Sequence, residues 1–85
     1  MKDLLMTNEQ AAKLIIHELE LAEMKHPKWD GPLHGHSVIE EEYIGFRDAV
    51  FADDDEQAFQ EVVQLGAMCA RFIKHHAPAS VRRFY

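Results

Sequence analysis

The sequence predicts an all-α fold built from three helices in one domain. Apolar residues recur at helical spacing in three segments, and proline, glycine or aspartate residues separate these segments. A chain of 85 residues has room for one domain, because a chain of this size buries only about 60% of the surface that its unfolded form exposes. We therefore predict a single all-α domain over residues 1–85, with its core in residues 8–76.

The first helix is predicted over residues 8–25. Thr7 and Gln10 have the spacing of a capping box, in which each side chain bonds the other residue's backbone N–H. The apolar side chains that follow recur every three to four residues, at Ala12, Ile15, Ile16, Leu19 and Ala22. Residues 26–32 contain two prolines and a glycine, so we expect a loop there.

The second helix is predicted over residues 37–52 and the third over residues 55–76. Ile39, Tyr43, Phe46 and Val50 recur along one face of the second helix. Three consecutive aspartates at residues 53–55 form the turn, where acidic side chains also favour the start of the next helix. Pro78 ends the third helix, and residues 79–85 have no assignable pattern.

The third helix is apolar on two faces, which suggests that it packs against more than its own chain. One face carries Phe59, Val62, Gly66, Cys69 and Ile73, and the other carries Leu65, Met68 and Phe72. Two further helices cover roughly one of these faces, so we expect a homodimer or higher homo-oligomer. The predicted architecture is an antiparallel four-helix-type bundle formed by self-association. Separately, the lone Cys69 has no disulfide partner in the chain and is expected in the core.

Composition excludes several classes of partner. The net charge of −6 repels phosphate backbones, so duplex nucleic acid is not an expected partner. No apolar run reaches the roughly 18 residues of a spanning helix, and the first residues do not resemble a secretory signal. We therefore expect no membrane partner and a cytoplasmic location.

Carboxylates interrupt the apolar pattern on the second and third helices. Glu42 projects between apolar positions, Glu41 lies on the flank of the same helix, and Glu61 falls on an apolar line of the third helix. Solvated helix charges are one explanation, because Glu is usually exposed. The other is a site for a hard divalent cation such as Mg²⁺, which takes oxygen ligands.

Two segments resemble the motifs of the MazG-like all-alpha nucleoside triphosphate pyrophosphohydrolases. That family carries a pair of glutamates, a third glutamate three residues later, and then Glu-x-x-Asp on the next helix. IEEEYIGFRDAV, from Ile39 to Val50, resembles the first motif, and EVVQLGAMCARFI, from Glu61 to Ile73, resembles the second. The preceding segment with Trp29 is similar to the loop before the glutamate pair, and the resemblance covers residues 9–76.

The resemblance implies that Glu41, Glu42 and Glu61 are catalytic residues that hold Mg²⁺ or Mn²⁺. The implied reaction is hydrolysis of a nucleoside triphosphate to a nucleoside monophosphate and pyrophosphate. It also implies that Lys28 contacts a phosphate and Trp29 stacks on the base. The alternatives are a solvated loop charge for Lys28 and a lid over the core for Trp29.

The metal-binding motif is degenerate in this chain. Gly45 stands where the family has its third glutamate, and Gln64 stands where it has aspartate. Gln64 still offers a carbonyl oxygen, and Asp48 is a candidate substitute carboxylate, so both join the predicted metal ligands. Fewer charged ligands mean weaker Mg²⁺ binding. The alternative function is therefore a non-catalytic helical assembly or nucleotide-binding regulatory module.

Overall fold

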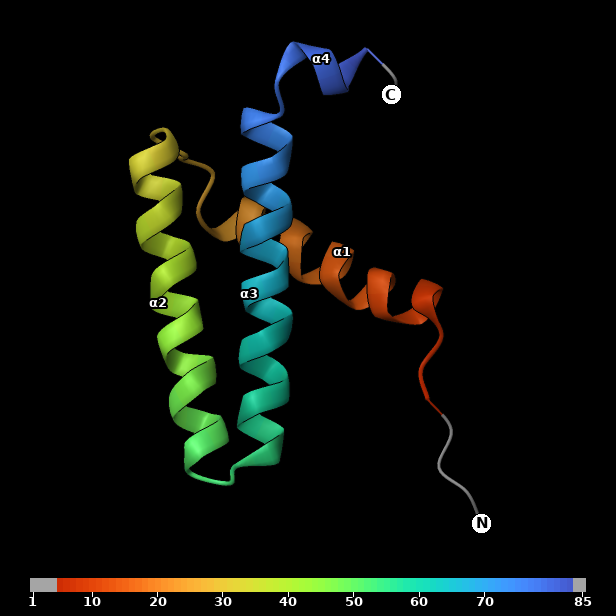
Figure 1. The fold of residues 1–85 in the computed structure, drawn as a ribbon, viewed down its shortest axis with the longest axis vertical. Coiled ribbons are helices and arrows are strands. Elements are labelled where there is room, and N and C mark those ends of the chain that lie inside the picture. Colours follow the sequence, from red (N-terminus) through yellow and green to blue (C-terminus); the bar gives the residue numbers. More distant parts are fainter. Residues whose placement is uncertain (1–4, 84–85) are drawn as a thin grey trace.

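The computed structural model describes residues 5–83 and is all-helical over that range (Figure 1). Its elements are α1 (Asn8–Lys25), α2 (Pro32–Phe51), α3 (Asp55–His76) and the short α4 (Ala79–Arg82). The predicted all-α class is confirmed. None of the helices in the described part of the chain has the length and apolar character needed to cross a membrane.

The helices form a hairpin with a crossing helix rather than three parallel rods. α2 and α3 run antiparallel, whereas α1 crosses α3 and its N-terminal half lies beyond the hairpin (Figure 1). The crossing is close because α3 presents small residues there. A Cβ added at Gly66 would lie 3.1 Å from Ile15 Cδ1. The predicted antiparallel order therefore holds for α2 and α3, while α1 departs from it.

The predicted helix starts at Thr7 and in the aspartate turn are confirmed. Thr7 Oγ1 accepts from Gln10 N–H at 3.1 Å, and Gln10 Oε1 accepts from Thr7 N–H at 2.8 Å. Asp54 Oδ1 accepts from Gln57 N–H at 3.1 Å and caps α3. Asp53 adopts a positive φ of 58°, a conformation that Asp tolerates better than most residues because its side chain can bond the local backbone.

The predicted start of the second helix was wrong, because α2 begins at Pro32, not near residue 37. Proline suits the first position of a helix, where its missing N–H has no partner to lose. The first turn carries no buried apolar side chain to mark it, since Leu33 is exposed. Residues 79–82, which had no predicted structure, form α4.

The core is small and lies where α1 and α2 meet α3. Its buried members are Leu19, Ala67 and Met68, with five partly buried apolar neighbours, Ile15, Ala22, Val38, Ile39 and Ala70. Cys69 is exposed, so its predicted place in the core was wrong. With Phe59, Val62 and Ile73, which are 52%, 38% and 65% exposed, Cys69 forms an exposed stripe on α3, whereas Gly66 of the same predicted face packs against Ile15 of α1.

Candidate functional site

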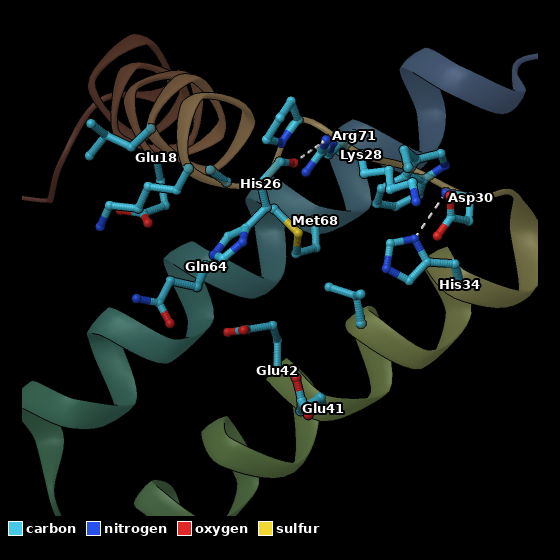
Figure 2. A pocket seen from close by; sticks show the side chains of 16 residues that line it. Glu18, His26, Lys28, Asp30, His34, Glu41, Glu42, Gln64, Met68 and Arg71 are labelled. Carbon is cyan, nitrogen blue, oxygen red and sulfur yellow. Dashed lines mark hydrogen bonds between the residues drawn. The ribbon is translucent and has the colours of Figure 1, made fainter.

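A cavity of about 720 Å³ lies between the end of α1, the α1–α2 loop, α2 and α3 (Figure 2). Charged side chains of both signs line it. Glu41 and Glu42 of α2 lie on one side, and Arg71 and Lys28 lie across the cavity beside the loop, where Asp30 also lies (Figure 2). Glu18 and Lys25 of α1 complete the charged lining. Gln64 also lines the cavity. The structure therefore brings together Glu41, Glu42, Gln64 and Lys28, which the sequence singled out.

The surroundings of Glu42 in the cavity disfavour the charged form of its carboxyl group. Its side chain is half-buried, and its Oε2 atom is buried with no hydrogen-bond partner. Desolvation raises the pKa of the Glu42 carboxyl above its usual range. The negative charges of Glu61, Glu41 and Glu18 raise this pKa further, in that order. A bound cation is the kind of partner that would relieve both effects.

Glu61 reaches across from α3 to α2 and lies over Gly45. A Cβ added at Gly45 would lie 2.6 Å from Glu61 Oε1 and 3.0 Å from its Cδ. The carboxylate of Glu61 therefore fills the space that a side chain at position 45 would need. Gln57 Nε2 donates to Glu61 Oε2 at 2.7 Å and holds it there. Glu61 and Glu42 are near enough for the charge of Glu61 to raise the pKa of Glu42.

Asp48 is exposed and does not line the cavity with Glu41, Glu42 and Gln64. Arg47 donates to its Oδ1 from both Nε, at 3.1 Å, and Nη2, at 3.0 Å. Within residues 5–83, no three His, Cys, Asp or Glu side chains are grouped so as to hold a metal ion.

Trp29 is fixed by the end of α3 rather than lying free in the cavity. Its Nε1 donates to His76 Nε2 at 2.8 Å, and its ring stacks on His75 with centroids 5.2 Å apart. Gly35 makes room for the indole, because a Cβ there would collide with the Trp29 ring and lie 2.8 Å from Phe72 Cδ2. Trp29 still lines the cavity, so it closes one wall.

Arg71 is the cavity residue that sequence reasoning missed. It is only 4% exposed, its Nη2 donates to His26 O at 2.7 Å, and its Cζ lies 5.1 Å from the centroid of the Trp29 ring. These contacts tie the α1–α2 loop to α3. Helical periodicity could have identified Arg71 as a cavity residue, because it follows Gln64 by seven residues and therefore lies on the same face of α3.

Comparisons with protein-family models, with curated proteins and with solved structures found no match to this chain. The resemblance to the MazG-like enzymes therefore rests on the motif residues.

The raised pKa of Glu42 leads to a prediction about stability. Between the usual Glu value of 4.5 and the higher folded value, the folded state binds more protons than the unfolded one. Stability therefore falls as pH rises through that window. We expect Glu42→Gln to raise the free energy of unfolding at pH 7, and the advantage to shrink below pH 4.5. Urea unfolding at both pH values measures this difference.

Glu40→Gln is the matched control, because Glu40 is exposed on the same helix and its substitution removes the same charge. It should change stability at pH 7 by less than about 0.5 kcal/mol, as surface substitutions usually do. Equal effects of the two substitutions would mean that the charged form of Glu42 does not lower the stability of the folded state.

Proposed function

We propose that this chain is a MazG-like nucleotide pyrophosphohydrolase that hydrolyses a nucleoside triphosphate to a nucleoside monophosphate and pyrophosphate with Mg²⁺ or Mn²⁺. The observation that carries the proposal is Glu42, whose buried Oε2 lacks a partner beside other carboxylates. A carboxylate in that position is costly unless a cation or donor satisfies it. The cavity volume lies within the range of small-molecule sites.

In this proposal the oxygen ligands come from α2 and α3. Glu41 and Glu42 supply carboxylates, Gln64 supplies its amide oxygen, and Glu61 joins them after leaving Gln57. All four are the hard oxygen donors that Mg²⁺ prefers. When bound, the metal would neutralise phosphate charge and activate the water that attacks phosphorus. Asp48 would contribute only if it left Arg47.

The loop side of the cavity would bind the rest of the nucleotide. Lys28 lines this side and its positive charge suits a phosphate. Trp29 offers an aromatic wall, although its contacts with His75 and His76 already hold it in one orientation. Lys28 would therefore orient the phosphates, and Trp29 would limit the space left for the base.

We also propose that a second copy of the chain covers the exposed stripe of α3. The core has few buried apolar side chains, and Phe59, Val62 and Ile73 are left largely in solvent. The N-terminal half of α1 also lies beyond the hairpin (Figure 1), where a short helix without packing is only marginally stable in water. A homodimer in a four-helix-type bundle would bury both regions.

The test of the catalytic proposal is release of pyrophosphate from a panel of nucleoside triphosphates with Mg²⁺ or Mn²⁺. We expect hydrolysis of at least one nucleotide, and a loss of at least about tenfold in Glu42→Gln, since even residues that merely support metal ligands have effects of about 10–100-fold. Glu40→Gln should retain the activity. Nucleotide binding without hydrolysis would instead support the non-catalytic regulatory module.

Restoring the two missing acids should strengthen metal binding. We expect the double variant Gly45→Glu with Gln64→Asp to bind Mn²⁺ more tightly in calorimetric titration and to release pyrophosphate faster. The new side chain at position 45 displaces only the flexible end of Glu61, and loss of a helix-interior glycine adds roughly 0.5–1 kcal/mol of stability.

The control for that double variant adds two acids to the same helices outside the cavity. Ser37→Glu with Gln60→Asp does so at exposed positions. Equal Mn²⁺ affinities in the two double variants would show that a general increase in negative charge, rather than a site at Glu42, binds the metal.

Self-association predicts that light scattering at micromolar concentration gives the mass of a dimer or larger oligomer. Ile73→Lys should weaken association by at least about tenfold, because burying one Ile is worth about 1.5–3 kcal/mol. Gln60→Lys places the same charge on an exposed polar position of α3 and should leave association unchanged. A cooperatively folded monomer would contradict the proposal.

A further inference from the structure

Arg71 is a buried cation without a buried anion. Its side chain is 4% exposed, and its Nη2 donates to the neutral carbonyl of His26. Its Nε is buried and has no hydrogen-bond partner. No carboxylate lies within ion-pair distance of it in the described part of the chain. Burying an ionised group in this way is costly unless a counter-charge is present.

Glu23 is influenced by the charge of Arg71 but is already engaged. Arg71 lowers the pKa of Glu23 only as a minor cause, whereas the hydrogen bond from Lys74 to Glu23, at 2.7 Å, is the largest cause. Asp30 lines the same cavity as Arg71 but forms no ion pair with it. An anionic ligand in the cavity would supply the missing counter-charge.

We propose that Arg71 and Lys28 form an oxyanion site at the end of the cavity opposite Glu42, and that this site binds a phosphoryl group. Both residues line the same cavity on the side of the α1–α2 loop (Figure 2). A guanidinium presents paired donors that match phosphate geometry, and Lys adds a mobile point charge. The Trp29 ring beside Arg71 limits its rotation and so prepares it for binding.

This site deepens the proposed function, on which its assignment to a nucleotide phosphate rests. A nucleoside triphosphate would then be held at two places, by oxygen ligands around Glu42 and by the cations at Arg71 and Lys28. Nucleosides without phosphate would lack the second contact and would bind weakly.

A purely structural role for Arg71 is the competing explanation, because its bond to His26 O also anchors the loop. The two explanations differ in the Nε atom, which that bond does not use. A ligand phosphate would contact guanidinium protons on the cavity side and so change the environment of the buried Nε–H. A loop anchor alone would leave them unaffected by added anions.

The experiment uses the whole chain, with chelator present so that no divalent metal contributes. Pyrophosphate, inorganic phosphate and acetate are titrated while the Arg71 Nε–H signal is followed by nuclear magnetic resonance, with Arg71→Lys used to assign it. We expect pyrophosphate to shift this signal and acetate to have little effect. Arg71→Gln keeps an N–H donor for His26 O, and we expect it to weaken pyrophosphate binding at least tenfold.

Lys13→Gln is the matched control, because it removes one positive charge from an exposed position outside the cavity. It should change pyrophosphate affinity by less than about twofold. An unshifted Nε–H signal in the unmodified protein, or equal losses in Arg71→Gln and Lys13→Gln, would overturn the proposal. The signal in the unmodified protein decides the question even if Arg71→Gln does not fold.

The outcome is separable from that of the catalytic proposal. Pyrophosphate binding at Arg71 without hydrolysis of any nucleotide would count against catalysis alone. Hydrolysis that is unchanged in both kcat and KM by Arg71→Gln would count against the oxyanion site alone.

Discussion

The close crossing of α1 over α3 determines where the candidate site lies. Gly66 and the fully buried Ala67 allow the two helices to approach, and Ile15 and Leu19 fill the contact. Because α1 crosses α3 instead of lying along the hairpin, a space remains between its C-terminal end, the loop and α2. That space is the cavity, so the candidate site is a direct result of the helix packing.

The loop is held in place by groups that are themselves part of the cavity wall. Arg71 bonds the carbonyl of His26, and Trp29 bonds His76. His34 Nδ1 accepts from the Asp30 N–H at 3.0 Å and fixes the last part of the loop. Arg71 is therefore held on the side of the cavity across from Glu41 and Glu42 (Figure 2). A ligand with a metal ion and phosphates would satisfy both sides at once.

The elements that the sequence predicted well are those with a local signal. Thr7 with Gln10, Asp54 and the apolar period of α3 identify helix boundaries from neighbouring residues alone. The half-buried position of Glu42 also followed from helical projection. These features depend on residues within one or two turns, which is the range over which sequence patterns are informative.

The features that the sequence did not predict depend on packing between distant segments. The crossing of α1 depends on Ile15 meeting Gly66, and the burial of Arg71 depends on a loop 45 residues earlier. Cys69 was expected in the core because a lone cysteine has no disulfide partner, but it is exposed in the structure. In the sequence, Gly45 stands where a metal ligand is missing. In the structure, its lack of a side chain also leaves room for the carboxylate of Glu61.

The most direct test of a metal site at Glu42 is to map where Mn²⁺ binds, using its broadening of backbone amide signals. The account predicts that substoichiometric Mn²⁺ broadens signals around Glu41 and Glu42 in α2 and around Glu61 and Gln64 in α3, and that Glu42→Gln removes this effect. Broadening centred instead on the exposed acidic turn at residues 53–55, unchanged in Glu42→Gln, would contradict it.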